Sequence, residues 1–161
     1  MAGSTATEPR KGIAQLAAAE DFVRFFAAGW EMPKPDGFIA HFKPRVHPQA
    51  RFVQPTLPPA SGPEGFEASF RGVFRLFPDY HVSVDDWAAR GDVVYIWLTH
   101  SVTIGRRRVS YKGVDRIVLE DGLIRERIAL FDSIEILPAA LLAPRIWPQF
   151  LRWTLARLRA G

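Results

Sequence analysis

Three carboxylates, Asp115, Glu126 and Asp132, interrupt a stretch of alternating apolar residues in the second half of the sequence. A carboxylate that is buried without a partner is costly or takes up a proton, so its place on an apolar face needs a reason. Either these side chains are satisfied by structural hydrogen bonds, or they line a pocket and act there as acids or bases. Glu126 lies nearest a predicted turn at residues 120–122, and this places it at a solvated rim.

The stretch 109–136 predicts two long strands joined by a tight turn at Glu120-Asp121-Gly122. Asp-Gly between apolar runs indicates a hairpin, because both residues tolerate the positive φ that a primed turn needs. With Asp121 and Gly122 as the loop, residues that pair across the hairpin share one face. The predicted pairs are Leu119 with Ile124, Ile117 with Glu126, Asp115 with Ile128, Gly113 with Leu130 and Tyr111 with Asp132. This face is mostly apolar, so we expect it to be the buried one.

The strand that precedes the hairpin adds a histidine to the same face. If Ile104 lies opposite Val109, then His100 faces Gly113 and is diagonal to Tyr111, within reach of a shared site. Asp132, Tyr111 and His100 then form a candidate acid/base cluster, with a tyrosine–aspartate hydrogen bond and a histidine bonded to backbone as the structural alternative. Asp115 and Asp132 are offset by four positions, about 13 Å, which is too far for a shared proton.

The order of the predicted elements indicates the fold class. Helical spacing over 13–30, 37–42 and 66–77 precedes strands over 81–86, 93–104 and 109–136, with a short strand at 51–54 and a loop over 55–65. Helices followed by antiparallel strands predict an α+β domain, a cone-shaped curved antiparallel sheet with three N-terminal helices packed on its concave face. An extra C-terminal helix follows. The predicted divisions are a disordered N-terminus over 1–11, the cone domain over 12–137 and an amphipathic helical extension over 138–161.

Composition narrows the classes of function. The chain has 161 residues, 48% hydrophobic and 24% charged, with no cysteine and a net charge of +4, which is typical of a soluble globular protein. No apolar run is long enough to span a membrane and no signal peptide is evident, so we expect a cytoplasmic protein. Basic residues are not interleaved with aromatic ones as in single-strand binders, and no metal-ligand spacing or phosphate loop is present. We therefore predict no nucleic-acid partner, no metal and no cofactor.

The sequence resembles the SnoaL-like branch of the ketosteroid-isomerase and nuclear-transport-factor-like superfamily. The resemblance covers about residues 16–137 and rests on the order of the elements and on short motifs. These motifs are His47-Pro48, Gly65-Phe66, Phe77-Pro78-Asp79, Gly91-Asp92-Val93-Val94, the segment 120–126 and Phe131-Asp132. It implies a cone fold with an interior cavity and a homodimer, for which the outer sheet face, with Trp97 and Thr99, is the candidate interface.

The resemblance also suggests site residues. Asp132 matches the acid/base of SnoaL-like polyketide cyclases, and Asp115 matches the protonated oxyanion donor of ketosteroid isomerases, an enzyme that is a standard example of a neutral buried carboxylic acid. Gln54 stands where the isomerases carry their general base and Phe25 where they carry a tyrosine, which argues against steroid-type isomerisation. An epoxide hydrolase is disfavoured because no arginine lies two residues from Asp115 along the strand.

Two functions follow from these residues. The first is a cofactor-free cyclase or isomerase that acts on an apolar, carbonyl-bearing compound, with Asp132, Asp115, His100 and Tyr111 as catalytic residues. Gln54, Phe25 and Trp30 are the candidate substrate-binding residues, although a core position is the alternative for Trp30. The second is a non-catalytic domain that binds a small ligand or dimerises.

The C-terminal helix is basic and amphipathic. One predicted stripe carries Trp147, Phe150, Leu151, Leu155 and Leu158. We favour packing of this stripe on its own domain or on a partner subunit, and membrane contact is the alternative.

Overall fold

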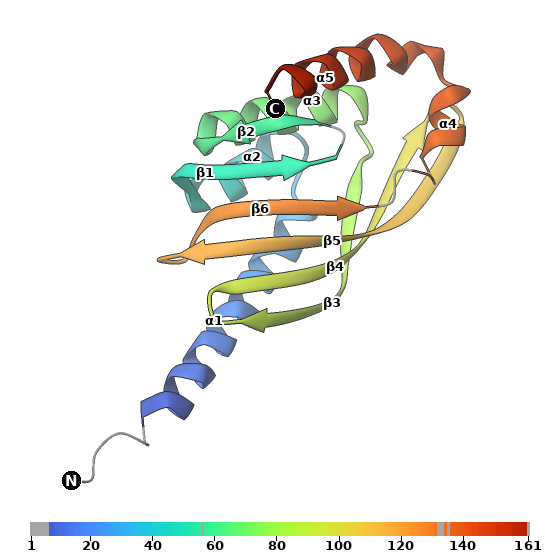
Figure 1. Cartoon of the computed structure of the whole chain (residues 1–161). Helices are drawn as coiled ribbons and strands as arrows, with labels where there is room; N and C mark the ends of the chain where they lie inside the picture. Colours follow the sequence, from blue (N-terminus) through green and yellow to red (C-terminus); the bar gives the residue numbers. More distant parts are fainter. Residues whose placement is uncertain (1–6, 56, 132–133, 135, 161) are drawn as a thin grey trace, which may run out of the picture.

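The computed structural model describes residues 7–55, 57–131, 134 and 136–160. Six strands form one curved, unclosed sheet in the order β2-β1-β6-β5-β4-β3, and helices complete an α+β fold (Figure 1). Neighbouring strands are antiparallel except β1 and β6, which pair in parallel. The sheet is therefore mixed, and the prediction of a purely antiparallel sheet was wrong at this one pair.

Three helices precede most of the sheet: α1 (Thr7–Trp30), α2 (Asp36–Phe42) and α3 (Gly62–Leu76). A stripe of phenylalanines four residues apart, Phe66, Phe70 and Phe74, is buried on α3, which gives the helix one apolar face. A short 3-10 turn over Lys43–Arg45 links α2 to the sheet. Helix α1 contacts β3 (His81–Arg90), whereas α3 contacts β1 (Val46–Gln54).

The sequence 55–65 contains a strand that the prediction missed. β2 (Leu57–Ser61) pairs with β1 at the edge of the sheet. The two adjacent prolines of β2 lack an N–H group, but an edge strand does not need these groups for pairing on its outer side. The proline-rich composition indicated a loop, but an edge strand tolerates proline. This strand matters for the site, because Leu57 is buried beside it.

The hairpin of β5 (Arg107–Glu120) and β6 (Leu123–Phe131) has the predicted turn, with positive φ at Asp121 and Gly122. Leu119 pairs with Ile124 as expected, but the next pair is Val118 with Glu126, so Arg125 is an extra residue on β6. Such a bulge exchanges the two faces of a strand beyond it. The predicted partners of Ile117, Asp115 and Gly113 were therefore wrong: Arg127, Ala129 and Phe131 point to the buried face in place of Glu126, Ile128 and Leu130. The predicted pair of Tyr111 with Asp132 lies outside the described residues.

The register of β4 (Val93–Ile104) against β5 is shifted by two residues from the prediction. A two-residue turn at Gly105 and Arg106 puts Ile104 opposite Arg107, so His100 pairs with Tyr111 and Leu98 with Gly113. A shift of two preserves the faces, because side chains alternate with period 2. His100 and Tyr111 therefore lie on the predicted face but closer together than expected.

The C-terminal segment comprises α4 (Leu137–Leu141), a 3-10 turn over Pro144–Ile146 and α5 (Trp147–Ala160). Figure 1 shows α5 beside α3 and β2, at the far end of the molecule from the start of α1. Trp153 of α5 lies 3.8 Å from the position that a Cβ at Gly72 of α3 would occupy.

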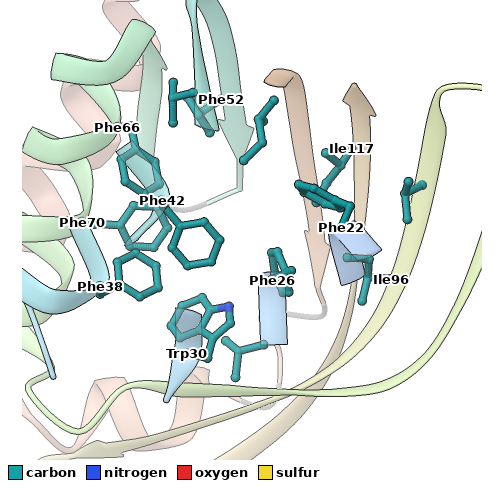
Figure 2. Close-up of a cluster of buried hydrophobic side chains, with 14 of the residues drawn as sticks. Phe22, Phe26, Trp30, Phe38, Phe42, Phe52, Phe66, Phe70, Ile96 and Ile117 are labelled. Carbon is teal, nitrogen blue, oxygen red and sulfur yellow. The ribbon is translucent and has the colours of Figure 1, made fainter. Parts of the chain in front are cut away.

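The buried apolar side chains form two clusters. The first core gathers aromatic side chains from α1, α2 and α3 over the sheet residues Ile96 and Ile117 (Figure 2). The second core lies at the other end of the same sheet face and includes Phe77, Val102, Ile104, Tyr111, Ile136, Ala139, Ala143 and Ile146. Among the described residues, three polar side chains are buried on the sheet between the two cores: His100, Asp115 and Arg127.

Candidate functional site

A buried ion pair between neighbouring strands forms the floor of the candidate site. Arg127 of β6 donates from Nε to Asp115 Oδ2 at 2.6 Å and from Nη2 to Asp115 Oδ1 at 3.1 Å. Asp115 is 1% exposed and Arg127 is 8% exposed. The bulge at Arg125 brings them together, because it turns Arg127 toward the buried face.

This pair changes the chemistry expected of Asp115. Burial raises the pKa of Asp115, and the charge and hydrogen bonds of Arg127 oppose that shift. Both carboxylate oxygens accept hydrogen bonds from a guanidinium, which stays charged in proteins, so the pair is ionised. The oxyanion donor predicted for Asp115 needs a free protonated carboxyl, and in this geometry Arg127 is the group with donors to offer.

Three aromatic rings stack beside the ion pair. The His100 ring is parallel to the Tyr111 ring, with centroids 4.8 Å apart and planes 5° apart. The Tyr80 ring lies 6.0 Å from the His100 ring, with planes 20° apart. The Tyr80 hydroxyl and His100 Nδ1 are 2.7 Å apart and share a hydrogen bond. Gly113 makes room for the imidazole, because a Cβ there would lie 2.6 Å from His100 Nε2. The space that Gly113 leaves is thus filled by the histidine itself.

The three rings are uncharged at neutral pH. Burial and the nearby charge of Arg127 lower the pKa of His100 to about 4. Burial raises the pKa of Tyr111 to about 12 and places the pKa of Tyr80 well above its usual range. The cluster can therefore donate hydroxyl hydrogen bonds, but its imidazole is a weak base.

A cavity of about 60 Å³ lies against these groups, between the sheet, α3 and α5. Its polar lining comes from Gln54, Tyr80, Tyr111 and Arg127. The remaining lining is apolar and comes from Leu57, Phe70, Val73, Phe77, Val102, Ile104, Phe131, Ile136, Phe150 and Trp153. An apolar chamber with a few convergent polar groups is typical of a small-molecule site.

The predicted site residues separate into two groups. His100, Tyr111, Asp115 and Gln54 come together, since Arg127 Nη1 also donates to Gln54 Oε1 at 3.3 Å. Asp132 lies outside the described residues. Phe25 and Trp30 lie elsewhere.

Phe25 and Trp30 of α1 belong to other surroundings than the cavity. Phe25 stacks on His41 at 4.2 Å, with Arg45 over its ring at 4.7 Å. Trp30 is buried in the first core, where its indole Nε1 has no hydrogen-bond partner among the described residues. Neither side chain lines the cavity beside Arg127.

Two residues of the site were not predicted, Arg127 and Tyr80. Arg127 was missed because the predicted register placed it on the outer face. The sequence did contain a signal for the alternative register, because Ala129 and Phe131 make the face of β6 that carries Arg127 apolar as well. Both faces of β6 are thus partly apolar, and the pattern alone did not decide which face is buried. Tyr80 directly precedes β3 and carried no periodic signal.

No three His, Asp or Glu side chains within the described ranges converge on a point where a metal ion could bind. The polar groups that line the cavity belong to Arg127, Gln54 and the two tyrosines.

Comparison with known proteins agrees with this architecture. A family model described as the SnoaL-like domain matches residues 22–127. The chain belongs to the SnoaL-like domain family. The comparison with curated protein sequences gives no match.

Solved structures share the fold of this SnoaL-like protein at low sequence identity. One is a candidate SnoaL-like polyketide cyclase from Jannaschia sp. CCS1, with TM-score 0.67, 19% identity, and coverage of 87% of this chain and 97% of that one. A protein with a ketosteroid isomerase-like fold from Catenulispora acidiphila has TM-score 0.65 and 13% identity, covering 73% of this chain and 90% of that one. An epoxide hydrolase of the LEH-like type from M. tuberculosis has TM-score 0.63 and 16% identity, covering 81% and 95%. The resemblance inferred from the sequence is confirmed.

Proposed function

We propose that this SnoaL-like protein binds an apolar, carbonyl-bearing small molecule in the cavity beside Arg127 and acts on it by cofactor-free acid/base chemistry, as a cyclase or isomerase. The observation that carries the proposal is the guanidinium at the floor of an otherwise apolar chamber. Its position is held by two hydrogen bonds to Asp115 before any ligand arrives. A preorganised donor of this kind stabilises negative charge as it develops on a substrate oxygen.

The remaining groups supply orientation and a proton acceptor. The hydroxyl of Tyr111 stays protonated and can donate to the same oxygen, while the hydroxyl of Tyr80 is hydrogen-bonded to His100. Asp132, by its match to the acid/base of SnoaL-like polyketide cyclases, is the proposed base that removes a proton next to the carbonyl. The electron pair then moves to the carbonyl oxygen as an enolate. In an isomerisation the enolate is conjugated with a neighbouring double bond, and Asp132 returns the proton at the far carbon of that system. In a cyclisation the enolate carbon attacks a second carbonyl carbon of the same substrate, the π electrons of that carbonyl move to its oxygen, and this oxygen takes the proton from Asp132.

One observation favours a non-catalytic binding domain as the second candidate. The cavity of about 60 Å³ is smaller than the roughly 300 Å³ at the lower end of common ligand sites. A substrate of polyketide size requires Phe150 and Trp153 of α5 to move outward. A protein that only binds a small apolar ligand requires less movement of these two side chains.

The test measures binding and chemistry separately, on a panel of cyclic and aromatic ketones. Quenching of tryptophan fluorescence reports binding, since Trp153 lines the cavity, and NMR reports deuterium exchange at the carbon next to the carbonyl. We expect Asp132→Asn to keep the affinity within about threefold and to lower the exchange rate at least about 100-fold. Asp92→Asn, at an exposed turn, is the matched control and keeps both.

Tyr111→Phe gives a second variant that preserves ring packing. We expect it to weaken ligand binding and slow exchange, because one hydroxyl donor is lost. A wild type that binds a ketone but exchanges no faster than Asp132→Asn would favour the binding domain.

A further inference from the structure

The outer surface of the C-terminal helices carries six exposed apolar side chains. They are Leu141, Leu142, Trp147, Leu151, Leu155 and Leu158, each between 46% and 73% exposed, and together we name them the C-terminal apolar surface. Four of them follow α5 at positions 147, 151, 155 and 158, a spacing that places them on one side of a helix. The predicted stripe is therefore divided: Phe150 turns inward to the second core and the cavity, and the rest faces outward.

An apolar groove continues this surface from α5 onto α4. It has a volume of about 320 Å³ and includes Leu141, Trp147 and Leu151 in its lining. The indole Nε1 of Trp147 donates to the backbone oxygen of Ala140 at 2.9 Å, which fixes the ring across the two helices. The surface is thus preformed by helix packing.

The same segment accounts for the net positive charge of the chain. Residues 136–161 contain four of the 21 Lys and Arg residues and none of the 17 Asp and Glu, so the remaining residues balance at 17 of each sign. Arg152 and Arg159 are exposed and seven positions apart, which places both along one flank of the apolar stripe. Arg145, in the 3-10 turn before α5, is also exposed.

We propose that the C-terminal apolar surface docks this protein on the surface of an anionic lipid membrane. An amphipathic helix with tryptophan and leucine on one side and arginine beside them lies in the plane of a bilayer, with its charges among the anionic headgroups. No helix in the described part of the chain is both long and apolar enough to cross a bilayer, so the contact is peripheral.

Charge decides between a membrane and a second copy of the chain as the occupant. A twofold interface brings the same surface of both subunits together. It would therefore oppose two segments that each carry four arginines and no acidic residue, which is unfavourable. An anionic bilayer complements the same charges.

The experiment is flotation of the full chain with vesicles of phosphatidylcholine containing 30% phosphatidylglycerol. We expect binding to these vesicles, little binding to pure phosphatidylcholine, and release at 0.5 M NaCl. The double variant Leu151→Glu, Leu155→Glu is expected to lose at least about tenfold in affinity. Arg152→Gln and Arg159→Gln are each expected to lose about fivefold.

Matched controls lie on distant exposed sites. Leu16→Glu on α1 and Arg90→Gln at the end of β3 make the same chemical changes and are expected to bind as the wild type does. Since all substituted side chains are exposed, every variant is expected to melt within a few degrees of the wild type.

Three results would overturn the proposal. They are absence of binding to the anionic vesicles, equal binding by the leucine variant and the wild type, or equal losses in the α5 variants and their controls. A dimer in analytical ultracentrifugation that Leu151→Glu dissociates would assign the surface to a subunit interface instead.

Discussion

The two cores share one face of the same sheet but differ in what fills them. In the first core, aromatic side chains from three helices leave a space of only about 10 Å³. The second core leaves about 60 Å³, bordered by the polar groups of Tyr80, Tyr111 and Arg127. Close packing stabilises the fold at one end, while incomplete packing beside satisfied polar groups leaves room for a ligand at the other.

The difference follows from the elements that cover each end. Helices α1 to α3 bring rings such as Phe22, Phe38 and Phe66 over the first core (Figure 2). The second core is closed by α4, α5 and the residues before β3, with smaller side chains such as Ala139 and Ala143. A site at this end can open without disturbing the aromatic cluster.

Removing one partner of the ion pair is expected to have the largest effect on stability. Asp115→Ala leaves the Arg127 charge buried and unpaired, so the free energy of unfolding should fall by about 3 to 5 kcal/mol. The double change Asp115→Leu, Arg127→Met replaces the pair with apolar groups and should recover most of that loss. Urea denaturation followed by circular dichroism measures both.

The same double variant makes the floor of the cavity apolar, like the first core. We expect its ketone affinity to fall although its stability returns. If the double variant were as unstable as Asp115→Ala, the ion pair would be required for folding and the contrast between the cores would be lost.

Acid is expected to destabilise the second core through His100. The pKa of His100 is about 4 in the folded protein, below its ordinary value of 6.5, so between these values the unfolded state binds the extra proton. Its contribution is therefore complete above pH 6.5 and decreases as pH falls to 4, by about 3 kcal/mol. Unfolding free energies of the wild type and His100→Gln across this range isolate the effect. The variant should show a flatter pH dependence by that amount, and identical slopes would argue against the buried neutral imidazole.

Removing one methylene group from each core is expected to have the smallest effects, and it compares the two cores directly. Ile96→Val in the first core should cost about 1 kcal/mol of unfolding free energy and leave ligand affinity unchanged. Ile104→Val lines the cavity and should change ketone affinity several-fold through its fit to the ligand. Equal effects on affinity would show that the ligand does not occupy the second core.

Local patterns in the sequence predicted much of the fold. Helical spacing located all three early helices, and alternation located β4 with its observed bounds, Val93 and Ile104. The Asp121-Gly122 turn was also correct, because its chemistry is local to two residues. β2 was missed because prolines at a sheet edge have the same composition as a loop.

The candidate site was predicted only in part, for a physical reason. Alternation placed His100, Tyr111 and Asp115 on one face, the family resemblance added Gln54, and the structure brings the four together. Their partners Arg127 and Tyr80 depend on a bulge and on the segment before β3. Neither feature has a periodic signature, since a bulge is selected by packing on both faces of a strand.

The extra residue at Arg125 also affects how this chain should be aligned with other proteins. Loss or gain of one residue there would exchange the inner and outer side chains of β6 from Glu126 onward, whereas a change of two would leave them in place. A single gap near this turn is therefore a larger structural difference than several substitutions along the strand. Residue-by-residue transfer of roles across such a gap would compare side chains on opposite faces of the sheet.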